Sequence, residues 1–232
     1  MTALESLKAE HRLLDRRAAD SIRSQILNGV LPAGSRLLET PISEQLEVSR
    51  GTVRAALAVL TREGLVEQVA FTRWQVSETS PRDAWELYTL RGAIEGLGAR
   101  LAVANITEAD ERWLRATLAE LVTAAKEKRY QDVVDIDFRL HKEIIEVAHH
   151  RRLAEQHAFL MQQVRFHMVH SGFYPKDYGA LVDEHAALIN AVAARDADLA
   201  EKLARSHNET EVQMLSAFVE QSASDATSLS ST

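Results

Sequence analysis

Residues 49–64, with the sequence SRGTVRAALAVLTREG, constrain the fold of this chain more than any other stretch. Serine is favoured immediately before a helix and glycine just after one, so Ser49 and Gly64 predict the two ends of a short helix. Arg50 and Arg54 lie four residues apart on its outer face, close to an N-terminus whose free N–H groups attract phosphate. At 100° per residue the opposite face is apolar, formed by Val53, Ala56, Leu57 and Leu60.

The segments on either side of this helix predict a small domain around it. In chain order they begin with an irregular lead-in over 1–14, a helix over 15–28 and a turn with a short extended piece over 31–38. A short helix capped by Thr40, with Pro41 at its first position, then runs through Glu47. After the arginine-bearing helix, a β-hairpin is expected over 65–69 and 73–77. This order is the layout of a winged helix-turn-helix, in which the second helix of the turn enters the major groove of DNA.

Two motifs extend this expectation to a family. PAGSRL at 32–37 and ISEQLEVSRGTVRAALAVLTREGLVE at 42–67 resemble the DNA-binding domain of GntR-type bacterial transcription regulators, over roughly residues 15–78. Trp74 stands where many members have a glycine. The small side chain of Gly51 also suits a close approach to a groove wall. The resemblance implies that operator DNA is contacted by the wing and by Arg36, Ser49, Arg50, Gly51, Thr52, Arg54 and Arg73.

A second domain is predicted from Ser80 onward, because Ser80 and Pro81 combine a helix cap with a proline suited to the first helical position. Helical periodicity then recurs near 82–104, 108–128, 131–148, 152–170, 181–194 and 196–219. We therefore expect a mainly α protein, with a winged helix-turn-helix followed by an all-α bundle of about six helices. The expected domains are 1–79 for DNA binding and 80–220 for effector binding and dimerisation, with a disordered tail over 221–232.

Composition restricts the class of protein. Residues 1–80 hold ten basic and ten acidic residues, so the net charge of −7 belongs to the part that follows, which argues against a non-specific nucleic-acid coat protein. The chain has no cysteine, no apolar run long enough to cross a membrane and no signal peptide, so a cytoplasmic protein without a membrane partner is expected. No catalytic serine–histidine–aspartate order, P-loop or dinucleotide fingerprint occurs, and we expect no enzymatic activity.

Polar residues lie on faces where the helical period predicts a core. Asp137 and His141 are four residues apart in the middle of an apolar stripe, which is either a buried hydrogen bond or half of a metal site. His185 and His207 interrupt two later apolar faces in the same way, and Glu211 follows His207 by one turn. Three imidazoles and a carboxylate would suit a divalent metal; Zn²⁺ is the expected ion, with Ni²⁺, Mn²⁺ and Fe²⁺ as alternatives.

The segment DFRLH at 137–141 and the later histidines give this part of the chain a resemblance of its own. Over roughly residues 82–218 it is similar to the FCD ligand-binding domain of the FadR/VanR branch of the GntR family. That domain commonly holds a metal through one aspartate and three histidines. The resemblance implies that the ligands here are Asp137, His141, His185 and His207.

Arg91 and Glu95 form a second inward polar pair, either a buried salt bridge or a site in which Arg91 receives a ligand carboxylate. The pattern LRxxIE resembles the first FCD helix, where such an arginine often faces the effector cavity, so we expect Arg91 to bind the effector and Glu95 to be structural. His149, His150 and His157 are expected to be solvated.

Three functions are compatible with these observations. The leading one is a homodimeric transcription regulator, expected to be a repressor, that binds double-stranded operator DNA and responds to a small carboxylate bound beside the metal. The second is a repressor that senses the metal itself. The third is a metal-dependent enzyme fused to a DNA-binding module, which lacks a candidate general acid or base beyond Glu211.

Overall fold

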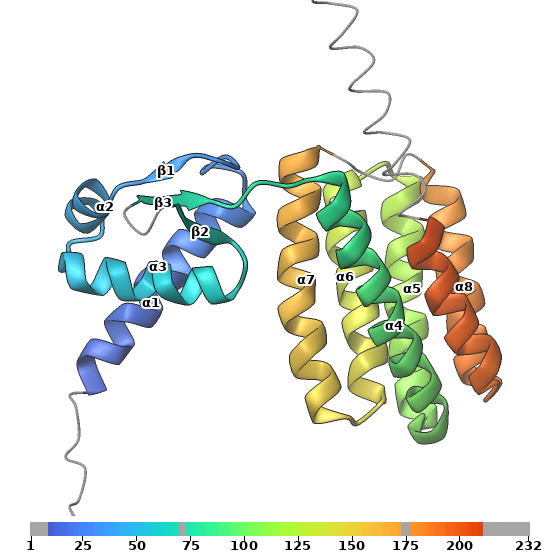
Figure 1. Ribbon diagram of the computed structural model, residues 1–232. Helices are drawn as coiled ribbons and strands as arrows, with labels where there is room; N and C mark the ends of the chain where they lie inside the picture. Colours follow the sequence, from blue (N-terminus) through green and yellow to red (C-terminus); the bar gives the residue numbers. More distant parts are fainter. Residues whose placement is uncertain (1–8, 70–72, 173–176, 211–232) are drawn as a thin grey trace, which may run out of the picture. The chain divides into compact units, whose positions relative to one another are not determined.

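The computed structural model describes residues 9–69, 73–172 and 177–210 of the chain. Within these residues the chain forms two compact units (Figure 1). The first contains residues up to 79 together with 165–172, and the second contains 80–164 and the described residues from 177 onward. The tail expected over 221–232 lies outside the described residues.

The first unit surrounds a three-stranded antiparallel sheet with strand order β1-β3-β2. Its elements are α1 (Ala9–Leu27), β1 (Arg36–Leu37), α2 (Glu39–Gln45), α3 (Arg50–Arg62), β2 (Val66–Val69) and β3 (Arg73–Val76). The apolar face expected for α3 is fully buried and packs with Ile22 and Ile26 of α1. The predicted winged helix-turn-helix is thus confirmed, with the hairpin tip at 70–72 outside the described residues.

The starts of two helices in this unit differ from expectation. The first helix already begins at Ala9, within the stretch expected to be irregular. The helix α2 begins at Glu39, after Leu38, whose side chain makes no capping hydrogen bond, so Thr40 lies inside the first turn instead of capping it. Pro41 is tolerated there because an N–H in the first turn of a helix has no intrahelical partner.

The second unit is a helical bundle whose helices lie side by side (Figure 1). It comprises α4 (Pro81–Asn105), α5 (Glu108–Lys126), α6 (Tyr130–Val147), most of α7 (Arg151–Ser171), α8 (Tyr178–Ala193) and a further helical stretch over 197–210. The Ser80 hydroxyl accepts from the N–H of Asp83 as predicted, and Thr107 forms a capping box with Asp110. No helix among the described residues is both long and apolar enough to cross a lipid bilayer.

The contact between α4 and α6 is unusually close because Gly98 has no side chain. A Cβ atom at Gly98 would lie 2.3 Å from Cδ1 of Ile145 on α6 and 3.6 Å from Cδ2 of Leu153. Ile145 is itself 2% exposed, so its side chain has little room to move away. This approach holds the first helix of the bundle against the helix that carries Asp137 and His141.

We predict that Gly98→Ala lowers the free energy of unfolding by about 1–3 kcal/mol through overpacking. Adding Ile145→Val, which removes Cδ1, should recover part of this loss. Urea denaturation of the single and double variants measures both effects. Gly51→Ala is the matched control, because a Cβ there meets only the Ser49 hydroxyl at 3.5 Å. A Gly98→Ala protein as stable as the wild type would contradict the prediction.

Candidate metal centre and nucleic-acid interface

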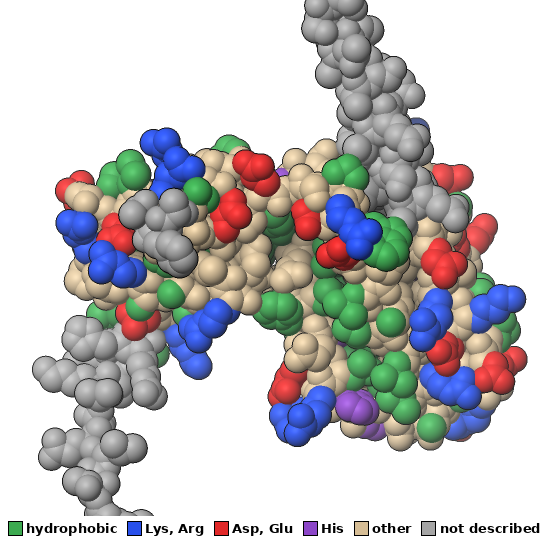
Figure 2. Space-filling view, in the orientation of Figure 1, with side chains coloured by type: hydrophobic (Ala, Val, Ile, Leu, Met, Phe, Trp, Pro, Cys, Tyr) green, Lys and Arg blue, Asp and Glu red, His purple; other side chains and the backbone are tan. Residues whose placement is uncertain are grey.

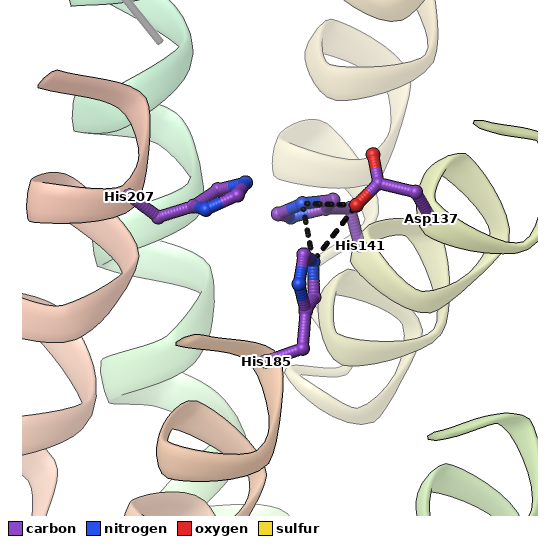
Figure 3. Close-up of side chains that lie close together, drawn as sticks. All are labelled: Asp137, His141, His185 and His207. Carbon is purple, nitrogen blue, oxygen red and sulfur yellow. Dashed lines mark hydrogen bonds and ion pairs between the residues drawn. The ribbon is translucent and has the colours of Figure 1, made fainter. Parts of the chain in front are cut away.

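Four side chains predicted to ligate a metal meet inside the helical bundle (Figure 3). Asp137 and His141 come from α6, His185 from α8 and His207 from the helical stretch 197–210. One potential ligand atom of each lies within 4.8 Å of those of the other three, and all four residues are buried. The four residues, which the helical period places on the inward faces of three separate helices, therefore form one cluster in space.

The shortest distances in this cluster join Asp137, His141 and His185. Oδ1 of Asp137 lies 2.9 Å from Nε2 of His185 and 3.7 Å from Nε2 of His141. The two Nε2 atoms are 3.1 Å apart. The His207 ring lies against both other imidazoles, with centroid separations of 5.1 Å to His141 and 4.7 Å to His185.

The outward-facing nitrogen of each histidine has an oxygen acceptor. Nδ1 of His141 lies 3.0 Å from Oε2 of Glu95, and Nδ1 of His185 lies 2.8 Å from the carbonyl of Leu181. Nδ1 of His207 lies 2.6 Å from Oε2 of Glu184. Since a carbonyl or carboxylate oxygen can only accept, each Nδ1 carries the proton, and in a neutral ring Nε2 presents its lone pair.

This arrangement fits a divalent metal ion. The facing Nε2 atoms of His141 and His185 would present two lone pairs to each other, an unfavourable contact that a cation between them would relieve. Their separation is close to the ~3.4 Å expected between ligands of a tetrahedral ion with bonds of ~2.1 Å. Burial lowers the pKa of His141 to about 4, so the ring is neutral at pH 7, as a ligand must be.

The charge of Asp137 also suits a metal ligand. Burial alone would raise the pKa of this carboxyl, but the surrounding imidazoles, first His185 and then His141, hold it below its ordinary value. Ionised Asp137 gives the cluster a negative charge that suits a cation. Carboxylate and imidazole together are ligands preferred by first-row divalent ions, Zn²⁺ among them.

Glu95 lies directly behind His141 and connects it to a second buried cluster. Its carboxylate accepts from Nε of Arg91 at 2.9 Å and from Nδ2 of Asn208 at 2.9 Å. Nε2 of His157 lies 3.1 Å from Oε1 of the same carboxylate. Burial would raise the pKa of Glu95, yet Arg91 and then His141 keep it well below its ordinary value. Glu95 therefore remains charged in the bundle interior.

Several residues differ in place or contacts from what the sequence led us to expect. Arg91, expected to meet an effector carboxylate, is fully buried and donates instead to Glu95. His157, expected to be solvated, is 2% exposed, because the side of α7 that bears it faces Glu95. Glu184 had no sequence signal, since its partner His207 lies on another helix, and Glu211 lies outside the described residues.

The residues expected to contact DNA lie in the first unit, mostly at the start of α3. The Ser49 hydroxyl accepts from the N–H of Thr52 at 3.0 Å and thereby fixes the helix N-terminus. The side chains of Arg50 and Arg54 are 64% and 62% exposed, whereas Thr52 is buried beneath Ser49. The other expected contacts are exposed or half-buried, namely Arg36 on β1, Gly51 on α3 and Arg73 on β3.

Glu39, which was not among the residues expected to contact DNA, lies beside these arginines. Glu39 accepts from Nε of Arg54 at 2.9 Å and from Nη2 of the same guanidinium at 2.7 Å. Nη2 of Arg50 is 3.7 Å away, and the indole N–H of Trp74 donates to Glu39 at 3.2 Å. These contacts, led by the hydrogen bonds from Arg54, lower the pKa of Glu39 to about 2.

Comparison with known proteins finds a matching family model for each of the two units. The family model described as "FCD domain" matches residues 86–210, and that described as "Bacterial regulatory proteins, gntR family" matches 14–72. The Glc operon transcriptional activator of Escherichia coli (strain K12) is 26% identical over 88% of this chain and 89% of its own length. A protein of the same strain assigned to regulation of the L-lactate dehydrogenase operon is 28% identical, covering 84% of each chain.

A solved structure agrees with these matches at the level of the fold. A protein from Rhodococcus sp. RHA1, assigned as a GntR transcriptional regulator, superposes with a TM-score of 0.71 at 24% identity, covering 88% of this chain and 98% of that one. The relatives are transcription regulators and not enzymes, in agreement with the expectation from the sequence.

We predict that Glu95→Ala lowers the free energy of unfolding by about 3–5 kcal/mol, because the Arg91 charge would stay buried without its counter-ion. Chemical denaturation measures the loss. Glu86→Ala is the control: it removes a carboxylate from the same helix, but one that is exposed and paired with exposed Arg82, so a change below about 1 kcal/mol is expected. Equal stability of the two variants would show that the buried pair is not required.

Proposed function

Because the chain belongs to the GntR family of bacterial regulatory proteins and carries an FCD domain, we propose that a small organic acid, bound beside a metal ion in that domain, controls its binding to operator DNA. The observation that carries the proposal is the cluster of one carboxylate and three imidazoles buried in the bundle. In this scheme residues 1–79 bind DNA, and residues 80–220 bind the effector and dimerise. As a bacterial DNA-binding regulator, the protein would act in the cytoplasm.

The DNA-binding step is assigned to the first unit. The N-terminal turn of α3 would enter the major groove, where Arg54 contacts a base edge and Arg50 contacts a base or a phosphate. The Ser49 cap keeps the first turn helical, and Gly51 leaves room for a close approach. Arg36 on β1 and Arg73 at the start of the wing strand β3 would add contacts to the DNA backbone.

The effector step is assigned to the second unit. Asp137, His141, His185 and His207 would hold the ion, while Glu95, the Leu181 carbonyl and Glu184 fix the ring orientations. The bound ion would supply positive charge and a coordination position for a carboxylate or hydroxyl oxygen. The relative assigned to the L-lactate dehydrogenase operon bears the name of a small hydroxy acid, which supports a ligand of this class.

Arg91 enters this scheme differently from what its sequence position suggested. Its guanidinium is enclosed and donates to Glu95, and Glu95 in turn holds His141. We therefore assign it a supporting role, in which it keeps Glu95 ionised and His141 oriented. A direct contact between Arg91 and an effector would require Glu95 to release it.

The same site supports a second candidate, in which the ion itself is the effector. The four ligands are at most 6% exposed, and such an enclosed cluster suits recognition of an ion as well as of a metal-bound carboxylate. The response of DNA binding to metal alone, measured without any organic acid, separates the two.

For the direction of regulation, we propose that the protein represses transcription and that the effector relieves this repression, although the Glc operon relative is named an activator.

We further propose that the regulator is a homodimer, since one winged domain covers only half of a two-fold operator. Three large apolar side chains of α4 are exposed, Trp85, Leu90 and Leu97. Figure 2 shows hydrophobic side chains along the face of the bundle that α4 occupies in Figure 1. This face could be buried against a second copy.

Removal of the metal should destabilise the protein. An ion that binds only the folded state stabilises it by about 2.7 kcal/mol at a hundred times its Kd, so chelation should lower Tm by roughly 5–10 °C. Elemental analysis and melting curves test this in the wild type and in Asp137→Asn, with Asp135→Asn, an exposed position on the same helix, as control.

The effector should act only through the metal-loaded protein. Addition of L-lactate or a related acid should weaken operator binding by the metal-loaded protein and leave that of the metal-free protein unchanged.

The four residues would be only a buried polar cluster if the wild type contained no ion and its Tm changed neither with added Zn²⁺ nor with a chelator. Operator affinity that responds to metal without any acid would favour the ion as effector. Tighter operator binding with the acid would indicate activation instead of relief of repression.

Sedimentation should give about twice 25.9 kDa for the wild type at micromolar concentration. Leu97→Glu should shift the protein toward monomer, since it places charge on the proposed interface. Leu199→Glu serves as control, because Leu199 is equally exposed, at 42%, on another helix. A monomeric wild type would contradict the homodimer, and a dimeric Leu97→Glu protein would move the interface to another face.

A further inference from the structure

The recognition helix carries two exposed arginines, and the structure holds them differently. Arg54 makes two parallel hydrogen bonds to Glu39, through Nε and Nη2, which is the strongest geometry an arginine and a carboxylate can form. Arg50 has a single contact to the same carboxylate at 3.7 Å. The orientation of Arg54 is thus fixed by the protein, while Arg50 keeps most of its rotational freedom.

The bond to Glu39 leaves the outer edge of Arg54 available. A guanidinium has five N–H donors, and the two that face Glu39 come from Nε and Nη2. The remaining three, two on Nη1 and one on Nη2, point away from the carboxylate, and the side chain is 62% exposed. Two parallel N–H groups on that edge match the O6 and N7 acceptors of guanine in the major groove.

Glu39 is itself held by Trp74. Cross-strand pairing puts Leu37 of β1 opposite Trp74 of β3, so α2, which begins two residues after Leu37, starts beside the indole. The ring is 9% exposed in the core of the first unit, and its N–H donates to Oε1 of Glu39. A side chain anchored in the core thereby positions the carboxylate that positions Arg54.

From this chain of contacts we infer that Glu39, anchored by Trp74, is a specificity-determining residue that directs Arg54 to a guanine base edge instead of to phosphate. This inference rests on the DNA-binding role proposed above. The carboxylate also offsets the charge of Arg54, which weakens its attraction to phosphates of any sequence. Glu39 thus favours binding to the correct sequence over binding to DNA in general.

The test compares wild type with Glu39→Gln, which keeps the shape but loses the charge and one acceptor. The probes are a duplex selected by the wild type from a randomised pool and a scrambled duplex of equal length, titrated by fluorescence anisotropy at fixed salt. The preference for the selected duplex should fall about tenfold, within the range for one bidentate base contact. Binding to the scrambled duplex should tighten and become more salt-dependent.

Two further measurements assign the effect to Arg54. Replacing each guanine of the selected duplex in turn by 7-deazaguanine, which lacks N7, should weaken wild-type binding at one position and leave Glu39→Gln almost unaffected there. In an Arg54→Ala background, Glu39→Gln should no longer change the preference. Trp74→Phe, which removes only the indole N–H and part of the ring, should lower the preference in the same direction by a smaller factor.

Glu44→Gln is the matched control, because it makes the same substitution at an exposed position of the same helix. It should leave the preference unchanged. An unchanged preference in both Glu39→Gln and Trp74→Phe, or an effect of Glu39→Gln that persists without Arg54, would overturn the inference. If Glu39→Gln tightened binding to both duplexes equally, Glu39 would only weaken the attraction of Arg54 to phosphate, and it would not determine specificity.

The proposed function fails in a different way from this inference. If the wild type enriched no sequence from the pool, sequence-specific DNA binding itself would be refuted, and the role of Glu39 with it. If the wild type did discriminate and the Glu39→Gln protein discriminated equally well, only the role of Glu39 would be refuted. Melting curves of each variant confirm that the compared proteins are folded.

Discussion

The arrangement of the helical domain depends on one buried charge, the carboxylate of Glu95. An ionised carboxylate inside a bundle is costly unless positive and hydrogen-bonding groups surround it. Here Arg91 supplies the charge, while Asn208 and His157 supply further hydrogen bonds. The remaining contact, with Nδ1 of His141, leaves Nε2 of that ring to face Asp137 and His185. The orientation of His141 therefore depends on how the charge of Glu95, which lies behind it, is compensated by Arg91.

Both domains use a carboxylate to hold a functional nitrogen group from behind. Glu95 and Glu184 orient two imidazoles of the candidate metal site, and Glu39 orients a guanidinium of α3. In each case the functional atom is the one that the carboxylate leaves uncovered. Orientation costs conformational entropy during folding instead of during binding, which raises both affinity and selectivity for the partner.

The sequence predicted the parts of these sites that lie along one helix, and not those that depend on how helices face one another. Asp137 and His141 stand out because their spacing matches the helical period on an apolar stripe. Glu184 and His157 do not, since each meets its partner only after helices from distant parts of the chain have packed at a particular rotation. Trp74 was visible as a departure from the family pattern, but its bond to Glu39 required the register of the sheet.

The glycine at position 98 has a mechanical consequence for the bundle. Gly98 rests on Ile145, and Glu95, one turn away, bonds to His141, so α4 and α6 are joined at two successive turns. Sliding one helix along the other would break a packed contact and a charged hydrogen bond together. The two helices should therefore move as one rigid body. Asn208 of the helical stretch 197–210 is bonded to Glu95 as well, so any shift that carries a signal through this domain would fall to α8, which brings His185 to the cluster.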